Sequence, residues 1–333
     1  MKNNFKVILV IIGAFIGAGF ASGKEIYTFF CIYGKNGIIS LCISTFLFSI
    51  VVYKALNIIK EKNIKNYNNF LSFIIKRNNK YLKALINNII NILILISFFI
   101  MIAGFGSYFN QEYGINNYVG SGFLALISYI VLKNGTNRLV KINQILVPII
   151  IGSIFIIGIL LIKKSQLIII ENNINRGFLK SGILYSSYNS IMIIPILVTV
   201  KDYINSKKSI FFISMVSGII VFVLSIFMFF LLNNNSYELQ NIDIPMIYIL
   251  NGNIILKNIY GVVILLAIST TAISLGSAFI KNVSDNKNNY PHIAKIICIV
   301  AVVVSLFGFS NLINLLYPIF GYIGIVQILK LFI

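Results

Sequence analysis

The residues with the greatest chemical potential lie close together in the first hydrophobic segment, at positions 13–25. Four glycines, one serine and one carboxylate interrupt an apolar run there, namely Gly13, Gly17, Gly19, Gly23, Ser22 and Glu25. Each glycine weakens a helix by roughly 1 kcal/mol relative to alanine. A helix in a bilayer tolerates freed backbone groups only where protein or a water-lined cavity satisfies them. The stretch therefore predicts a membrane helix that is interrupted around something it binds.

The glycine spacing also has a purely structural interpretation. Gly13 and Gly17, like Gly19 and Gly23, are four residues apart, the spacing of small residues where two membrane helices pack closely. The density of glycines beside polar side chains nevertheless favours a break. At such a break, freed amides attract carboxylates and freed carbonyls coordinate cations.

Glu25 is the only acidic residue inside a predicted span, since the other seven lie in loops or at segment ends. A carboxylate within a span costs on the order of 3 kcal/mol and usually faces the interior of the helix bundle. It could bind a substrate ammonium, carry a proton or pair with a cation. Alternatively, Glu25 lies near the end of the span and reaches the outer surface together with Lys24.

Composition places the chain among polytopic all-α membrane proteins. It has 333 residues, of which 58% are hydrophobic and 11% charged, and its mean hydropathy is +0.93. Soluble chains are about 45–50% apolar and about 25% charged. With about 20 apolar residues needed per membrane helix, ten spans are predicted at 6–33, 36–58, 84–110, 117–133, 139–162, 178–200, 209–232, 256–280, 292–309 and 311–330.

The first residues resemble a signal peptide. A membrane span is favoured instead, because the apolar run continues through Tyr33, past any cleavage site near Ser22. The one long polar link, at 60–83, contains an apolar patch at 70–75 that is either a short interfacial helix or part of a loop.

The formal net charge of +19 is distributed as in a membrane protein. Most lysines and arginines fall between alternate hydrophobic segments, which predicts cytoplasmic N- and C-termini in a multi-pass protein of the cytoplasmic membrane. A nucleic-acid surface would instead gather them on one soluble face. The predicted partners are the lipid bilayer and a small solute, and no nucleic acid; the sequence predicts no particular protein partner.

Ten spans divide into two sets of five, predicted as one transmembrane domain with pseudo-repeats at about 1–165 and 176–333. Because five is odd, the repeats would insert with opposite topology, as in many secondary transporters. Spans 1 and 6 then correspond, and span 6 contains six polar or amphipathic residues, 185–190, followed by Pro195. We expect span 6 to be interrupted as well; the alternative is close packing of helices through its serines.

Span 8 offers oxygen ligands on one helix face. Thr270 and Thr271 follow Ala267 by three and four residues, so the three share a face. Two hydroxyls and a carbonyl suit Na⁺. In the alternative interpretation, these hydroxyls bond back to carbonyls of their own helix.

No enzyme is predicted. The single histidine, His292, stands beside Pro291, and Cys31, Cys42 and Cys298 show no metal or disulfide spacing. No cofactor is expected, other than Na⁺ as a coupling ion.

The motif at 13–25 resembles the start of the YkvI-like family of bacterial membrane proteins, within the amino acid–polyamine–cation superfamily that shares the LeuT-type fold. This resemblance implies a 5+5 inverted repeat with helices 1 and 6 unwound at a central site. Carbonyls of Gly13 and Ile16, with Ala267, Thr270 and Thr271, would form a sodium site. The implied substrate pocket is lined by Gly17, Gly19, Ser22, Gly23, Tyr185, Ser186, Ser187, Tyr188 and Asn189, to which residue analysis adds Glu25.

Two departures qualify this resemblance: LeuT-like transporters have twelve spans, and Glu25 has no fixed counterpart. The expected function is a secondary transporter of an amino acid or related amine. Coupling to Na⁺ is favoured over H⁺ coupling through Glu25. The alternative is a ligand-sensing membrane subunit on the same fold, as in spore-germinant receptors.

Overall fold

The described helices pack together into one bundle. The computed structural model describes residues 2–64, 67–75, 80–133, 139–162, 176–204, 206–233, 238–284 and 286–332. The α-helices are α1 (Lys2–Phe15), α2 (Ala18–Ser22), α3 (Lys24–Phe29), α4 (Lys35–Glu61), α5 (Tyr67–Ile75), α6 (Lys80–Tyr113), α7 (Asn117–Leu132), α8 (Leu139–Ile162), α9 (Phe178–Thr199), α10 (Lys207–Asn233), α11 (Pro245–Ile249), α12 (Ile254–Val283), α13 (Tyr290–Ser305) and α14 (Phe309–Phe332). Short 3₁₀ turns η1 (Cys31–Tyr33), η2 (Lys201–Tyr203), η3 (Leu250–Gly252) and η4 (Lys287–Asn289) lie between them.

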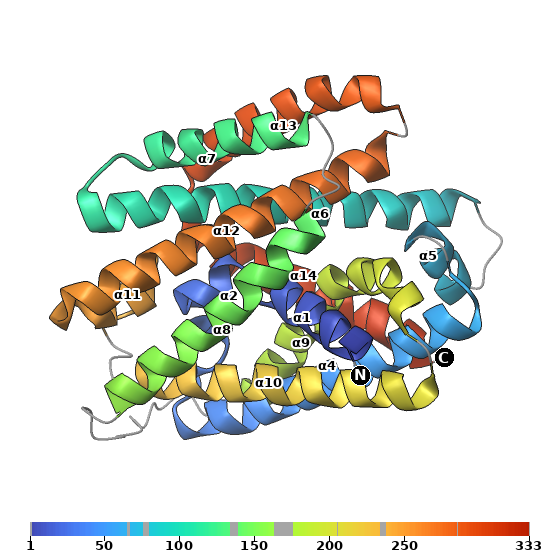
Figure 1. Ribbon diagram of the computed structural model, residues 1–333, viewed down its shortest axis with the longest axis horizontal. Coiled ribbons are helices and arrows are strands. Elements are labelled where there is room, and N and C mark those ends of the chain that lie inside the picture. The colour runs from blue at the N-terminus through green and yellow to red at the C-terminus, as the bar shows by residue number, and fades with distance from the viewer. Residues whose placement is uncertain are drawn as a thin grey trace.

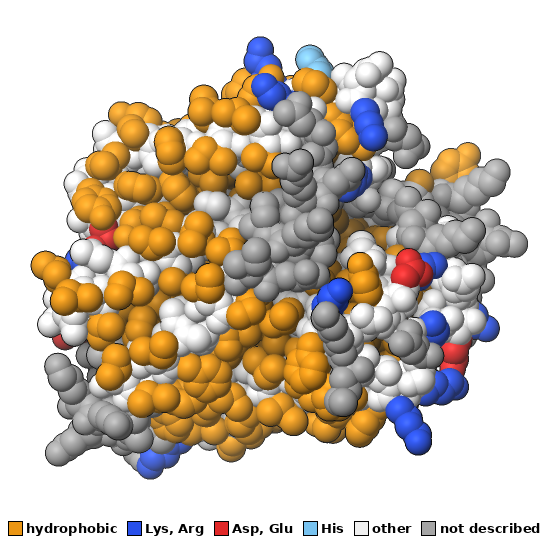
Figure 2. Space-filling model, in the orientation of Figure 1, with side chains coloured by type: hydrophobic (Ala, Val, Ile, Leu, Met, Phe, Trp, Pro, Cys, Tyr) orange, Lys and Arg blue, Asp and Glu red, His pale blue; other side chains and the backbone are white. Residues whose placement is uncertain are grey.

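The predicted fold class, an all-α polytopic membrane protein, is confirmed. Seven of the described helices are long and apolar enough to cross a membrane, and three shorter apolar helices account for the remaining predicted spans. Figure 2 shows apolar side chains over much of the left and lower parts of one face, while most Lys and Arg side chains lie toward the end where both termini lie in Figure 1.

The apolar patch in the long polar link is helical. It forms most of α5, which packs against α6, α9 and α14. Phe70 is buried, and Gln327 of α14 donates a hydrogen bond to the Tyr67 hydroxyl over 3.0 Å. α5 therefore closes one end of the bundle rather than standing as a loop.

The centre of the bundle is the first span, which α1, α2 and α3 share. α1 packs against α8, α9 and α10, α2 against α12, and α3 against α9, α10 and α14. Figure 1 shows α6, α7 and α13 along one side of this centre and α4 and α10 along the other. Every residue of α2 and nearly every residue of α3 is therefore buried within the bundle.

Helix lengths and contacts repeat between the two halves of the chain. α4 and α10 each have 27 residues, α7 and α13 each have 16, and α8 and α14 each have 24. Pro148 and Pro318 stand at the same position in α8 and α14. Contacts also come in matching pairs, such as α1 with α10 and α9 with α4.

These equalities are what a two-fold relation between five-span repeats would give. The division into 1–165 and 176–333 stays a prediction that they support, and residues 163–175, which contain the expected boundary, lie outside the described residues.

Candidate functional site

The first span is interrupted where the glycines are densest. α1 ends at Phe15, and the backbone at Gly17 is extended, with φ −87° and ψ −174°. The Gly17 amide donates to the Phe15 carbonyl over 2.9 Å, and the Ala18 amide points to the Met101 thioether at 3.4 Å. Neither amide continues the helical ladder, so the carbonyls of Gly13 and Ala14 are released from it.

A second irregularity follows one helical turn later. Gly23 adopts φ +83°, a left-handed conformation that side chains other than glycine rarely accept. This reversal separates the five-residue α2 from α3 and turns Lys24 and Glu25 in different directions. Ser22 caps the junction, since its hydroxyl donates to the Gly19 carbonyl over 3.0 Å and accepts from the Lys24 amide.

Glu25 points into the bundle and is only 2% exposed. The Tyr185 hydroxyl donates to Glu25 Oε2 over 3.1 Å, and the ring of Tyr188 lies beside that of Tyr185, with centroids 5.4 Å apart. In the described part of the chain no lysine or arginine forms an ion pair with Glu25. A buried carboxylate without such a partner requires a proton or a bound cation to neutralise it.

The prediction that span 6 is broken is wrong. α9 runs without interruption from Phe178 to Thr199. The polar side chains return to their own helix: Ser187 donates to the Ile183 carbonyl over 2.7 Å, and the Asn189 amide to the Tyr185 carbonyl over 2.9 Å. Pro195 removes only one ladder donor, so the helix continues through it.

A cavity of about 290 Å³ begins at the break in the first span. The predicted site residues that line it are Gly13, Gly17, Glu25, Tyr188, Asn189 and Thr271. It extends along α9 and α12 to Thr199 and Lys281, which are exposed. The structure therefore brings residues of spans 1, 6 and 8 together around one space that opens at one end of the bundle.

The other predicted residues lie outside the cavity lining. Gly19 lies under the Glu25 carboxylate, Gly23 packs against Leu232 and Met246, and Tyr185 lies behind Glu25 as its hydrogen-bond donor. The remaining ones are buried or bonded within their own helices, namely Ser22, Ser186, Ser187, Ile16, Ala267 and Thr270.

The two threonines of α12 differ in their contacts. The Thr270 hydroxyl donates to the Leu266 and Ala267 carbonyls over 3.0 and 3.1 Å, as the back-bonding alternative expects. Thr271 lines the cavity, with its methyl group beside Gly17. Of the two threonines, only Thr271 therefore lines the same cavity as Gly13 and Ala14, whose carbonyls are released.

Sequence reasoning missed two side chains of this site. Met101 of α6 lines the cavity beside Gly17, and Tyr317 of α14 stacks on Tyr188 with ring centroids 4.6 Å apart. Tyr317 precedes Pro318, which corresponds to Pro148 in the other half of the chain. The repeated proline could have drawn attention to this part of α14. Met101 had no sequence signal, because its place depends on how α6 packs.

The chemistry of the cavity suits a small cation or the cationic end of a solute. It combines one buried carboxylate with the tyrosine rings of Tyr188 and Tyr317, and aromatic faces attract cations. Among the described residues, no group of three or more His, Cys, Asp or Glu side chains could hold a transition metal.

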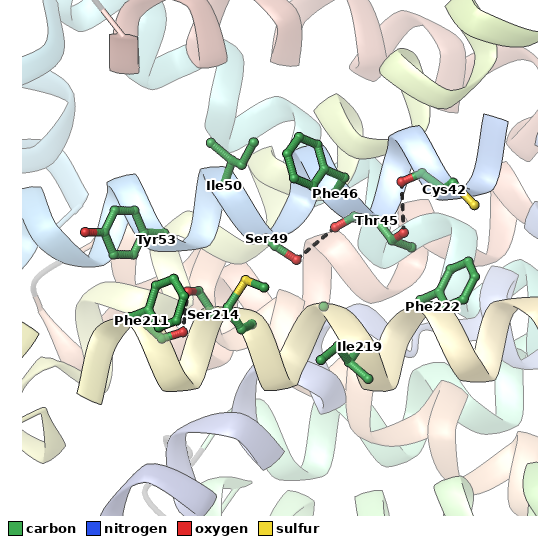
Figure 3. A pocket seen from close by; sticks show the side chains of 12 residues that line it. Cys42, Thr45, Phe46, Ser49, Ile50, Tyr53, Phe211, Ser214, Ile219 and Phe222 are labelled. Atoms are coloured by element: carbon green, nitrogen blue, oxygen red, sulfur yellow. Dashed lines mark hydrogen bonds between the residues drawn. The ribbon is translucent and has the colours of Figure 1, made fainter. Parts of the chain in front are cut away.

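A larger groove between α4 and α10 has a different character. Its volume is about 540 Å³, and Figure 3 shows Cys42, Phe46 and Tyr53 opposite Phe211 and Phe222. The hydroxyls of Thr45, Ser49 and Ser214 in it donate to carbonyls of their own helices. The other residues of its lining are mainly apolar, and none of them is a carboxylate.

We predict that Gly19→Ala disturbs the site by moving Glu25. A Cβ at position 19 would collide with the Glu25 carboxylate. Displacement of the order of 1 Å at a functional site can cost about a hundredfold in activity, so we expect ligand binding to weaken by about tenfold or more. Thermal unfolding and ligand titration of the purified variant measure both effects.

The matched control is Gly122→Ala in α7, where no atom lies within 4 Å of the added Cβ. There alanine should stabilise the helix by up to about 1 kcal/mol. Equal behaviour of the two variants would contradict the placement of Glu25 over Gly19.

Comparisons with known proteins agree with this architecture. No family model matches the chain. Over 96% of its length it is 26% identical to the uncharacterized membrane protein YkvI of Bacillus subtilis (strain 168), covering 92% of that protein. It is also 24% identical to the uncharacterized protein YyaD of the same organism, over 97% of this chain and 94% of the other.

Among solved structures, a Na⁺-coupled sialic acid symporter in a substrate-bound outward-open state matches 98% of this chain and 76% of its own. The TM-score is 0.56 at 13% sequence identity, which shows a shared fold of the LeuT-like type. The resemblance to the YkvI-like membrane proteins that the first-helix motif indicated is thereby confirmed along nearly the whole chain.

Proposed function

We propose that the chain is a cation-coupled secondary transporter of a small solute and works by alternating access around its interrupted first span. The observation that carries this proposal is the position of Glu25, a buried carboxylate that has no ion pair among the described residues and faces a cavity at a helix break. Intramembrane carboxylates of this kind mark substrate and ion pathways. The fold shared with a Na⁺-coupled symporter supports the same conclusion.

Na⁺ is our preferred coupling ion. Gly13 and Ala14, whose carbonyls are released from the helical ladder, line the same cavity as Thr271. Oxygen atoms of this type are the ligands that hard cations take. Ile16, Ala267 and Thr270, which the family resemblance implied as further ligands, are less well placed, because they do not line the cavity.

We infer that the cargo is an amino acid or a related amine. Glu25 would bind the ammonium group, and the rings of Tyr188 and Tyr317 would face it. We also propose that the open mouth at Thr199 and Lys281 lies on the cytoplasmic side, which the lysine distribution supports. The arrangement would then be inward-facing.

Uptake into proteoliposomes tests the proposal. Purified protein should accumulate one or more labelled amino acids or amines when an inward Na⁺ gradient is imposed, and should accumulate less when K⁺ replaces Na⁺. A parallel pH gradient tests H⁺ coupling through Glu25. Absence of uptake, together with no ligand-induced thermal shift across a broad solute panel, would refute the proposal. Ligand binding without uptake would instead support the sensing alternative.

A further inference from the structure

A segment distant in the sequence covers the outer part of the first span, and Lys24 of that span holds it directly. Residues 238–250, which include α11, lie over α2 and α3 at the end opposite Thr199 and Lys281. Lys24 is fully buried, and its Nζ donates to the Gln240 carbonyl over 3.0 Å and to the Ile242 carbonyl over 2.9 Å. We call residues 238–250 the cap segment.

Three further contacts hold the cap segment and the first span in place. Gln111 of α6 exchanges two hydrogen bonds with the backbone of Ile244, over 3.0 and 2.9 Å. The Asp243 carboxylate accepts from the Ser310 amide at the start of α14. Tyr260 of α12 donates to the Ala21 carbonyl over 2.8 Å. Neighbouring spans thus form hydrogen bonds with the cap segment. Among the described residues, Lys24 is the only residue of the interrupted first span whose side chain does so.

The hydrogen bonds that Lys24 makes to the cap segment can be broken at a moderate cost in free energy. Its acceptors are two neutral carbonyls, and Asp243 supplies the favourable opposite charge. Hydrogen bonds from a charged donor are strong, but burial of the ammonium costs much of what they contribute. Once separated from the cap, Lys24 would regain hydration.

Lys24 and Glu25 are neighbours on the six-residue α3, which follows the left-handed Gly23. One side chain holds the cap and the other faces the cavity. A rotation of α3 would therefore move both, so that occupation of the cavity and release of the cap are coupled mechanically.

We propose that Lys24 is the latch that keeps the cavity closed at the cap end. The proposal rests on the alternating-access function proposed above. Removal of the ammonium should let the cap segment lift and expose the cavity to the side that is sealed in this structure.

Thiol labelling tests the latch without any substrate. Cys31, Cys42 and Cys298 are first replaced by alanine, because Cys42 is exposed. Met101→Cys then places a single reporter thiol in the cavity lining. A membrane-impermeant maleimide is applied to intact cells and, separately, to inverted membrane vesicles.

With Lys24 present, the reporter should react from the Thr199 side and only slowly from the cap side. Lys24→Met keeps the length and apolar stem of the side chain, and we expect it to raise the cap-side labelling rate by about tenfold or more. The control is Lys257→Met, a lysine paired with Glu112 over 2.6 Å, which should leave that rate unchanged.

A second variant guards against misfolding. Gln111→Leu removes the reciprocal bonds to Ile244 and should raise cap-side labelling in the same direction, by a smaller factor. Unchanged labelling in both folded variants would overturn the latch, whatever uptake shows. A labelling increase in a protein that never transports would keep the latch and refute the proposed function.

Discussion

Replacement of Glu25 by glutamine should reduce solute uptake by more than about tenfold while the protein still folds and inserts. The substitution keeps the shape and accepts the same hydrogen bond from Tyr185, but it removes the negative charge that faces the cavity. Interactions with a charged group contribute roughly 1.5–3 kcal/mol, and 1.4 kcal/mol corresponds to about a tenfold change in binding. Initial uptake rates and ligand titration of the same preparation measure the loss.

A second acidic variant separates this effect from a general loss of charge. Glu238→Gln changes an exposed carboxylate in the cap segment that accepts a hydrogen bond from Tyr248. It should leave uptake within about twofold of the unmodified protein, as surface substitutions usually do. Full activity of Glu25→Gln, with normal ligand affinity, would show that Glu25 has only a structural role beside Tyr185 and Tyr188.

The break in the first span could be predicted because its cause is local. Glycine density acts on the backbone of its own segment, and a buried acid in the same stretch raises the same expectation. The positions of the long apolar helices were predictable for a similar reason, since length and apolar content suffice to identify a membrane helix.

Span 6 shows where this kind of reasoning fails. Serine and asparagine side chains can replace ladder hydrogen bonds at a break, or they can bond back to an intact helix. The sequence at 185–190 is compatible with both, and in the structure Ser187, Asn189 and Ser190 take the second option. Correspondence with span 1 was therefore not sufficient to predict a break.

The directions of Lys24 and Glu25 were equally undecidable from the sequence. Consecutive helical residues point about 100° apart, so Lys24 and Glu25 must contact different neighbours. The direction of each side chain depends on its hydrogen-bond partner. Carbonyls of the cap segment accept from the Lys24 ammonium, and the Tyr185 hydroxyl donates to the Glu25 carboxylate. Both partners are distant in the chain, and no local pattern encodes them.

The contrast between Thr270 and Thr271 provides the second large effect. We expect Thr271→Val to raise the Na⁺ concentration for half-maximal uptake by about tenfold, the change that 1.4 kcal/mol produces. Valine keeps the branched shape but removes the hydroxyl of Thr271, the one threonine of α12 that lines the cavity among the described residues. Uptake measured against Na⁺ concentration, at a fixed solute concentration, gives the value directly.

Thr270→Val is the matched control, because it removes the same group one residue away. Its hydroxyl already donates to two carbonyls of its own helix, so its loss should change sodium dependence by less than about twofold. Equal shifts in both variants would place the ion on neither threonine and would remove α12 from the sodium site. A large shift for Thr271→Val alone would locate the coupling ion between the interrupted first span and α12. That position is next to the cavity that Glu25 faces, so movement of one short segment could affect both ion and solute.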